Sequence, residues 1–468
     1  MHTSVNVVVV GAGAAGLAAA AQFNELGLSC QVIEAQNRVG GRVRTLFHGN
    51  GRAVDLGAQM INADMRSVLD LARTGSLHCS VVPNSGQDLC VIANKVFPRD
   101  EFIDHDTVDM VLEARLDRVY GPSSDVRFFD CLTTWFRTVG FRKPFRTQQN
   151  SRDASVLRMS VADVLRMLPL STHDKQLART QFCEQYGVAA ECLNALAVKQ
   201  AFQSYQSDRP DLEFHFPEGM EKITDQLAGQ LSFPPKLNAR VERVSCVGQR
   251  VEVVTGADIW LCDFVVIAVP PPAASKISFV IEESKALRDL LGSFQPGSVI
   301  KTTLEFRSAF WRLHGWSGRI SFTDPMGLEV VDTSFDDSSP PRLTAFLGGP
   351  KAAEWASLNS DHRIAKLLDL LALALGDEAR TPKSFEEALW VEGSVCGGGY
   401  NSSVRVEGVH NAAQKLREWT GRVRFAGAEL DTAFAGYVEG AIRNGRAVAA
   451  EIAHTLHANG KPHLAHER

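Results

Sequence analysis

The beginning of the chain alternates between two kinds of hydrophobic pattern. Residues 5–10 read Val-Asn-Val-Val-Val-Val, a β-branched run that ends at a glycine and predicts a buried strand. The alanine-rich stretch from Gly16 to Leu26 predicts a helix, and Ser29 to Glu34 predicts a second strand. Strand, helix and strand in this order make a βαβ unit.

Strand patterns of the same kind return much later in the sequence. The last of them is followed by a helix from about Tyr437 to Leu456. The three predicted strands lie at Arg250–Thr255, at Phe264–Val269 before a Pro270-Pro271-Pro272 stop, and at Val423–Phe425. The start, the middle and the end of the chain therefore all carry the strand and helix patterns of a nucleotide-binding domain.

Two regions of different character separate these pieces. Residues 100–205 are helix-rich, with Ser160 and Asp163 forming a capping box. Residues 296–388 alternate strand-like segments with a helix, at Val299–Phe306, Arg342–Leu347 and Asp361–Leu375. We therefore expect one discontinuous domain interleaved with a second domain.

Composition narrows the class of protein. The 468 residues exceed the size at which a single core stops growing, which agrees with two domains. A net charge of −5 gives no indication of the basic surface that nucleic-acid binding requires. Nine cysteines without a CxxC pair, and histidines without HxH or HExxH spacing, argue against disulfides and metal and favour a cytoplasmic protein. No apolar run approaches the roughly 20 residues that span a bilayer, so no membrane partner is expected.

The turn between the first strand and the first helix reads Gly11-Ala-Gly13-Ala-Ala-Gly16. In a dinucleotide fingerprint the first glycine permits the tight turn, the second lets the backbone approach a diphosphate, and the third lets helix and strand pack closely. Glu34 ends the second strand, where an acid takes the ribose hydroxyls. This pattern predicts dinucleotide binding without choosing between NAD and FAD.

The residues after Glu34 favour FAD. A second glycine pair, Gly40-Gly41, allows another close backbone approach, and Arg42 can meet the diphosphate bidentately. With the further turn Asp55-Leu56-Gly57-Ala58-Gln59, this arrangement resembles the flavin-containing amine oxidase family, which includes monoamine, polyamine and L-amino acid oxidases. The resemblance continues down the chain in the family's order, at Val241, Ala268–Pro271, Lys301 with Phe310-Trp311, Trp390, Gly397–Tyr400, Phe425–Glu429 and Gly436–Ala441.

The resemblance implies a fold and a cofactor site. The fold is α/β, with a discontinuous FAD-binding Rossmann-like domain (1–75, 225–290 and 390–456) and an α+β substrate-binding domain (76–224 and 291–389), before a polar tail at 457–468. Val438 opens a helix whose free N–H groups would face the flavin C2 carbonyl. The residues expected to bind FAD are Gly11, Gly13, Ala14, Ala15, Gly16, Glu34, Ala35, Gly41, Arg42, Gly57, Ala58, Gln59, Met60, Val241, Gly427, Glu429, Val438 and Ala441.

Four residues are expected to carry the chemistry. Lys301 lies in a strand of buried type, either as an edge lysine that reaches solvent or, as the resemblance implies, as the lysine that holds a water against flavin N5. The resemblance places Tyr400 and Tyr437 as the walls of an aromatic cage in front of the flavin, although both could also be core tyrosines. Trp390 belongs to the segment under the flavin ring.

Two departures from the family pattern refine the prediction. Gly399 stands where monoamine oxidases carry the cysteine that bonds the flavin, so non-covalent FAD is expected; Cys396 lies three positions earlier. L-amino acid oxidases place a carboxylate-binding arginine soon after the turn at Gly57, and here Gln59-Met60-Ile61-Asn62 follows instead. An amine without a carboxylate is the expected substrate, unless an arginine such as Arg319 reaches the site.

The expected reaction is amine oxidation. A hydride passes from the amine α-carbon to flavin N5, the imine is hydrolysed, and reoxidation by O2 gives hydrogen peroxide. The alternatives are an amine dehydrogenase with another electron acceptor and a C–C desaturase, and, with less support, an L-amino acid oxidase or a non-catalytic flavin scaffold. Amine and O2 are the expected partners, with a homodimer as the default assembly. Aromatic, aliphatic, cyclic and polyamine substrates all remain open.

Overall fold

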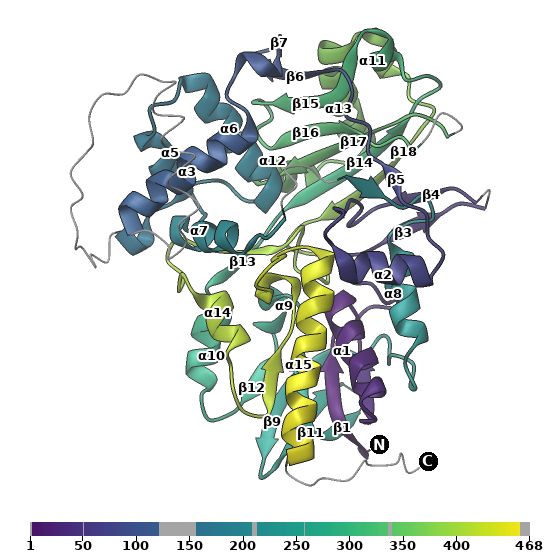
Figure 1. Cartoon of the computed structure of the whole chain (residues 1–468), viewed down its shortest axis with the longest axis vertical. Coiled ribbons are helices and arrows are strands. Elements are labelled where there is room, and N and C mark those ends of the chain that lie inside the picture. Colours follow the sequence, from purple (N-terminus) through teal and green to yellow (C-terminus); the bar gives the residue numbers. More distant parts are fainter. Residues whose placement is uncertain are drawn as a thin grey trace.

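The computed structural model describes residues 2–49, 51–120, 156–207, 213–256, 258–335 and 339–458. Two seven-stranded sheets organise them, one in the lower and one in the upper half of Figure 1. Strands of the lower sheet come from the beginning, middle and end of the chain, as the sequence predicted. The domain limits expected from the sequence stay a prediction.

The lower sheet is built around the first strand. Its order is β12-β9-β10-β11-β1-β2, with β20 beside β11, and β1 runs parallel to both of its neighbours. Side chains of β1 alternate between two cores because successive residues point to opposite faces. The strands are β1 (His2–Val10), β2 (Cys30–Ile33), β9 (Val241–Val247), β10 (Arg250–Thr255), β11 (Ile259–Ile267), β12 (Ser278–Val280) and β20 (Val423–Phe425).

Helices cover both faces of the lower sheet. On one face α1 (Ala14–Glu25) packs against the long α15 (Val438–Ala458), and Figure 1 shows them side by side. They cross so closely at Gly445 that a Cβ there would lie 2.2 Å from the Ala15 carbonyl oxygen. The same face holds α2 (Arg66–Thr74) and α8 (Glu221–Gly229), and the opposite core holds α10 (Ser284–Leu291) and α14 (Ala412–Arg417).

The upper sheet has the order β18-β14-β17-β16-β15-β6-β7. One face is apolar and packs beneath α11 (Phe310–Leu313), α12 (Pro350–Ala356) and α13 (Ser360–Leu375). The other face carries polar residues at alternate positions, such as Lys301, Thr303 and Glu305 of β14. The strands are β6 (Gln87–Ile92), β7 (Lys95–Pro98), β14 (Val299–Glu305), β15 (Trp316–Phe322), β16 (Leu328–Asp332), β17 (Arg342–Gly348) and β18 (Ser384–Trp390).

A helical group flanks the upper sheet. The capping box expected at Ser160 and Asp163 is confirmed, since each side chain bonds the other residue's backbone N–H at the start of α5. The group contains α3 (His105–Tyr120), α5 (Val161–Met167), α6 (Thr172–Tyr186) and α7 (Ala195–Ser204). The rest of the helix-rich prediction, from 121 to 155, lies outside the described residues, as does the predicted polar tail beyond residue 458.

Short elements complete the described chain. They are β3 (Thr45–Phe47), β4 (Ala53–Asp55), β5 (Ser80–Val81), β8 (Phe214–His215), α9 (Pro271–Ala274), β13 (Phe294–Pro296) and β19 (Ser402–Val404), with 3-10 turns at Arg99–Glu101, Val156–Arg158, Asp377–Arg380 and Ala428–Leu430. No described helix is long and apolar enough to cross a membrane.

Some helices and strands begin or end at other residues than the sequence predicted. The first helix begins at Ala14 and ends at Glu25, so it starts two residues before the predicted Gly16. The strand predicted at Phe264–Val269 is the second half of the longer β11, which stops at Ile267 before the proline run. Hydrophobic pattern alone missed β6, β15, β16 and β18. Buried polar residues interrupt the pattern of β15 and β16, and half-buried polar residues begin β6 and β18.

Candidate functional site

A cavity of about 2540 Å³ extends between the glycine turn of the lower sheet and the polar face of the upper sheet. Every residue expected to bind FAD or to carry the chemistry lines it except Gly16. The set includes residues as distant in sequence as Gly11, Val241, Lys301 and Tyr437. The fold thus brings together at one place the residues expected to bind a cofactor and those expected to act on a substrate.

The glycine turn has the geometry that its sequence predicts. Gly11 adopts φ +106, and a Cβ there would lie 2.7 Å from Val269. A Cβ at Gly16 would lie 1.9 Å from the Gly11 carbonyl oxygen. Gly16 therefore allows the helix to pack closely against the turn, and it lies behind the cavity wall. At Gly13 the nearest atom to a Cβ is the Gly40 oxygen at 4.0 Å, which leaves the backbone open to the cavity.

Glu34 closes this turn from the end of β2. One carboxylate oxygen accepts the Ala12 N–H at 2.7 Å and the other accepts the Gln36 N–H at 2.8 Å. The side chain is 6% exposed and lines the cavity together with Ala35 and Gly41. A carboxylate held by two backbone donors keeps one orientation, as a group that recognises a ribose requires.

Arg42 has an acidic partner that the sequence did not predict. Two of its nitrogens pair with the two oxygens of Glu429 at 2.7 and 3.1 Å, and one also donates to the Tyr400 carbonyl at 2.8 Å. Burial opposes the charge on both groups, but their pairing outweighs it, raising the pKa of Arg42 and lowering that of Glu429. Glu429 also accepts the Ser402 N–H at 3.0 Å. The pair thus fastens the segment before Tyr400 to the cofactor side.

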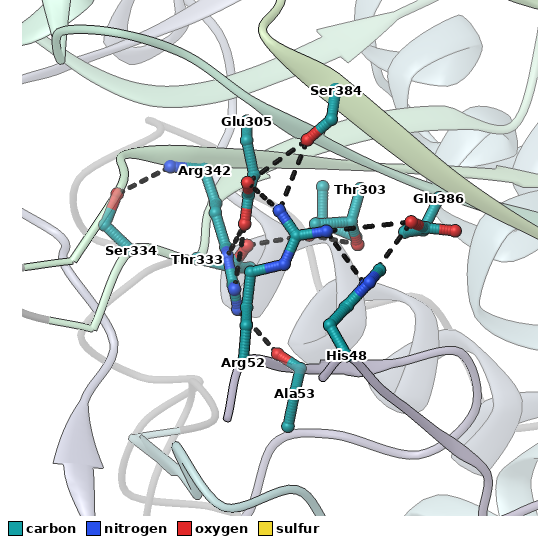
Figure 2. Close-up of polar contacts among 11 residues, drawn as sticks. His48, Arg52, Ala53, Thr303, Glu305, Thr333, Ser334, Arg342, Ser384 and Glu386 are labelled. Carbon is teal, nitrogen blue, oxygen red and sulfur yellow. Dashed lines mark hydrogen bonds and ion pairs between the residues drawn. The ribbon is translucent and has the colours of Figure 1, made fainter. Parts of the chain in front are cut away.

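A buried network of charges fastens the chain around residue 53 to the upper sheet (Figure 2). Arg342 of β17 donates to Glu305 of β14 at 2.9 Å and to the Ala53 carbonyl at 3.0 Å. Arg52 approaches the same Glu305 carboxylate from the other side and bonds Ser384 at 3.3 Å. Arg342 and Glu305 are 4% and 3% exposed, so this is an interior connection between the two halves of the chain.

Lys301 lies on the next part of the same strand face. It is 2% exposed, and its Nζ donates to the Gly57 carbonyl at 2.9 Å. Burial lowers its pKa to about 8, and the nearby Asp55 carboxylate opposes this shift. Burial likewise raises the pKa of Asp55 to about 6, against the effect of Lys301. The alternative of an edge lysine reaching solvent is wrong, because β18 pairs with β14 on its outer side.

Trp390 stands opposite Val299 across the β14–β18 pair. Its indole N–H donates to the Leu56 carbonyl at 2.7 Å, and its side chain is 9% exposed. Gly399 passes directly over it: a Cβ at Gly399 would lie 2.7 Å from the Trp390 Cβ. This position therefore has room only for glycine unless the tryptophan moves.

Tyr400 lies in the cavity wall with a partner that the sequence analysis did not identify. Its hydroxyl donates to Glu184 of α6 at 2.9 Å, and its ring meets Phe346 of β17 edge-on at 6.1 Å between centroids. Loss of solvent raises the pKa of Glu184 to about 7, while the Tyr400 hydroxyl acts against the shift. Burial and the neighbouring Glu184 raise the pKa of Tyr400, so the phenol stays neutral.

Tyr437 lies just before α15, beside Tyr205. Their ring centroids are 5.2 Å apart with 31° between the planes, and Tyr205 also accepts from Asn62 at 3.1 Å. Tyr186 lines the cavity as well, so four of the five tyrosines of the chain gather at it. Tyr186 and Tyr205 lie within the helix-rich stretch, where no motif marks them.

The remaining predicted positions lie along the same walls. The segment from Gly57 to Met60 passes beneath Lys301, and a Cβ at Gly57 would lie 2.0 Å from the Arg42 carbonyl oxygen. The Gly427 N–H donates to Asn444 of α15 at 2.9 Å, near the first turn of that helix. Ala14, Ala15, Ala58, Gln59, Val438 and Ala441 all line the cavity.

Comparison with known proteins identifies the family. Residues 14–453 match the family described as flavin containing amine oxidoreductase. The chain belongs to this family. Flavin-containing amine oxidase B of Sus scrofa is 28% identical over 485 residues, covering 98% of this chain and 88% of the relative. Flavin-containing amine oxidase A of Sus scrofa is 27% identical over 470 residues, covering 97% and 85%.

Solved structures agree with this assignment. Cyclohexylamine oxidase from Brevibacterium oxydans IH-35A superposes with a TM-score of 0.81 at 25% identity, covering 97% of this chain and 99% of that one. Wild-type putrescine oxidase bound to putrescine superposes with a TM-score of 0.79 at 23% identity, which shows a common fold. The chain is thus an oxidoreductase of the flavin amine oxidase type, with the two-domain α/β fold that the sequence predicted.

Proposed function

We propose that this member of the family is an FAD-dependent amine oxidase whose flavin is bound non-covalently in the cavity described above. The observation that carries the proposal is the shared cavity. The glycine turn, Glu34, Lys301 and the tyrosines Tyr400 and Tyr437 all open onto it. Such an arrangement provides a dinucleotide cradle at one end and a chamber with aromatic walls at the other.

The residues present fit FAD. The open backbone at Gly13 and the first N–H groups of α1 suit the diphosphate, and Glu34 suits the ribose. Val241 lies on the cavity wall where the adenine would contact the backbone. The start of α15 at Val438 offers further N–H groups to the polar edge of the flavin ring.

The space around Gly399 and the place of Cys396 support non-covalent binding. A side chain at position 399 would collide with Trp390. The Cys396 thiol faces Gln36 at 3.6 Å, and the charged groups near it include Glu34, the residue proposed to bind the ribose. Acid precipitation should therefore release all of the flavin into the supernatant. Yellow colour that stays with the precipitate would contradict this part of the proposal.

The flavin, when bound, accepts the hydride from the amine C–H bond, and its reoxidation by O2 produces hydrogen peroxide. The chain's own groups position the reactants. The rings of Tyr400 and Tyr437 offer apolar faces that hold a neutral amine and attract a protonated one. Lys301, whose Nζ is fixed by the Gly57 carbonyl, would hold a water against flavin N5. Its lowered pKa lets it hold or release a proton near neutral pH.

Anaerobic reduction tests the proposed function. We would mix the oxygen-free holoenzyme with primary, secondary, cyclic and poly-amines and with amino acids, and follow the flavin band near about 450 nm. Bleaching by an amine class is the expected result, and hydrogen peroxide should then appear when oxygen is admitted. Bleaching without reoxidation by oxygen would assign an amine dehydrogenase. No bleaching by any amine would contradict amine oxidation and favour C–C desaturation or a flavin scaffold.

Amino acids are expected to be poor substrates in this panel. Arg319 does line the cavity, but it interacts with two carboxyl groups there, Glu184 and Glu329, and offsets part of the rise in pKa that burial causes in each. An arginine that already balances two acids does not offer a free charge to a substrate carboxylate.

A further inference from the structure

Gln59 lines the cavity two residues after Gly57, whose carbonyl accepts a hydrogen bond from Lys301. Its side chain is 8% exposed, and the amide nitrogen Nε2 lies 3.4 Å from Nδ1 of His215. The amide oxygen Oε1 is buried and has no hydrogen-bond partner among the described residues. A buried acceptor without a donor is costly, so a ligand that supplies a donor there is favoured.

His215 holds this amide from behind the cavity wall. It is fully buried in β8 and does not itself line the cavity, and the Phe335 ring covers it with 4.4 Å between the centroids. Burial lowers the pKa of His215 to about 4, and Arg342 and Lys301 act in the same direction. Asp332 opposes them, but the ring stays neutral near pH 7. An amide nitrogen only donates, so Nδ1 of the neutral ring is the acceptor, and Nε2 carries the proton without a partner among the described residues.

Backbone contacts fix the glutamine and the histidine relative to each other. The Ile61 N–H donates to the Phe214 carbonyl at 2.8 Å, and the Phe214 N–H donates to the Ile61 carbonyl at 2.9 Å. The chain that follows Gln59 therefore runs beside the strand that carries His215, and this strand pairs in turn with β5. An amide held in this way keeps Oε1 in one orientation, as a preorganised acceptor requires.

The hydroxyl groups of the aromatic walls already have partners. The Tyr400 hydroxyl donates to Glu184 at 2.9 Å, and the Tyr437 hydroxyl is hydrogen-bonded to Tyr205. A neutral amine that leaves water for this chamber brings N–H groups that lose their acceptors in water. Gln59 offers such an amine an oxygen that still lacks a donor.

We propose that Gln59 positions the substrate by accepting an N–H group of the neutral amine, that His215 holds Gln59 for this purpose, and that the enzyme consequently prefers primary and secondary amines to tertiary amines. The proposal rests on the proposed function, because it assumes that an amine is oxidised in this cavity. Neutral primary and secondary amines carry an N–H group, whereas a neutral tertiary amine carries none. A tertiary amine would therefore leave Oε1 buried and unpaired.

Methylation of the substrate nitrogen tests this hydrogen bond. Each amine that bleaches the flavin is compared with its N-methyl and N,N-dimethyl derivatives in anaerobic single turnovers. The rate of forming the carbonyl product common to the three amines is divided by the half-saturating concentration. The parent should favour the amines with an N–H group over the tertiary amine by about 10- to 100-fold, as expected for a buried acceptor left unpaired. In Gln59→Met, which keeps the length of the side chain and removes the acceptor, this preference should fall to about threefold or less.

Binding of an unreactive amine gives a readout that does not depend on turnover. An alkylamine whose carbon next to nitrogen carries no hydrogen cannot be oxidised, and the methyl ether of the same alkyl group has no N–H group. The binding of each is followed through the change that it causes in the flavin absorption spectrum. Gln59→Met should weaken binding of the amine about tenfold and leave binding of the ether unchanged.

Variants of His215 separate a positioning role from a general structural role. His215→Leu removes the acceptor at Nδ1 and should lower the preference for N–H groups as Gln59→Met does. His215→Asn keeps an acceptor near the place of Nδ1 and should restore most of the preference. Gln249→Met is the matched control, because Gln249 is exposed and lies outside the cavity lining, and it should behave as the parent does. Equal loss of bound flavin in both His215 variants, with an unchanged preference per bound flavin, would show that His215 has only a structural role.

The remaining outcomes also decide the proposal. Equal rates for secondary and tertiary amines in the parent, or an unchanged preference in Gln59→Met, would overturn the hydrogen bond and leave amine oxidation intact. An unchanged preference together with slow reoxidation by oxygen in Gln59→Met would assign Oε1 to a water beside Lys301 instead. No reduction by any amine would overturn the proposed function itself. If Gln59→Met does not retain flavin, the preference of His215→Leu decides in its place.

Discussion

Replacing Arg342 with methionine should destabilise the whole enzyme, although Arg342 lies outside the residues assigned to chemistry. Its guanidinium makes contacts at 2.9 Å with Glu305 and at 3.0 Å with the Ala53 carbonyl, in an interior where both charged side chains are almost fully buried (Figure 2). Methionine keeps most of the length and apolar stem but removes these donors. Glu305 would then depend on Arg52 and Ser384 alone.

The expected loss of folding free energy follows from the buried charge of Glu305, which loses one of its two arginine partners. Removing one partner of a buried ion pair costs about 3–5 kcal/mol. Because Arg52 still faces Glu305, we expect the lower end, about 3 kcal/mol for Arg342→Met. With a urea dependence of about 3 kcal/mol per M for a chain of this size, the unfolding midpoint should fall by up to about 1 M.

Urea unfolding of the flavin-loaded protein, followed by circular dichroism and by flavin release, measures this change. Arg380→Met is the control, because Arg380 makes its ion pairs with Asp369 and Asp377 at the surface, and its midpoint should match the parent. Adding Glu305→Gln to Arg342→Met should cost less than the sum of the two single changes, since both remove the same buried ion pair. Equal midpoints for Arg342→Met and Arg380→Met would refute the reasoning.

Three further changes test other parts of the structure. Lys301→Met should slow reoxidation of reduced flavin by O2 at least about tenfold (~1.4 kcal/mol) in stopped-flow experiments, with a smaller effect on reduction by amine; an unchanged reoxidation rate would exclude the lysine. Gly16→Ala places a Cβ 1.9 Å from the Gly11 oxygen and should give protein without flavin, seen as a missing visible band, whereas Gly229→Ala, in open space, should retain it. Glu184→Gln tests the raised pKa of Glu184. The stability that protonated Glu184 contributes is complete below about pH 4.5 and is lost as the pH rises through about 7. The melting temperature of the variant relative to the parent should therefore rise over that range, and a constant difference would contradict the raised pKa.

The cofactor end was predictable because its constraints are local. Gly11, Gly13 and Gly16 stand within one turn, and each is required by a contact or a backbone angle a few residues away. The valine run of β1 is buried on both faces, which a continuous apolar strand indicates. Local sterics of this kind leave a signature in the sequence itself.

The substrate end was less predictable because it depends on strand register. Glu329 looks like any polar residue that alternates with Leu328 and Val330 in a strand. Only the pairing of β16 with β17 places it in one row with Phe346 and Lys301. Glu184 lies on a helix of mixed composition, and nothing nearby in sequence shows that it meets Tyr400, 216 residues away. The pairing of Arg42 with Glu429 could not be foreseen either, because the two residues are 387 positions apart.

The contacts between the two halves explain why these residues cannot be divided cleanly into structural and catalytic groups. The carbonyls of Ala53, Leu56 and Gly57 accept hydrogen bonds from three side chains of the upper sheet: Arg342, Trp390 and Lys301. The short segment from Ala53 to Gly57 is therefore held by the same sheet whose polar face lines the cavity. A lysine that fixes a cradle carbonyl at 2.9 Å supports the cavity as well as its chemistry. The activity of Lys301→Met should consequently be expressed per bound flavin before any loss is attributed to slower reaction with oxygen. Without the lysine the Gly57 carbonyl loses its hydrogen-bond donor, which would weaken flavin binding even in the absence of substrate.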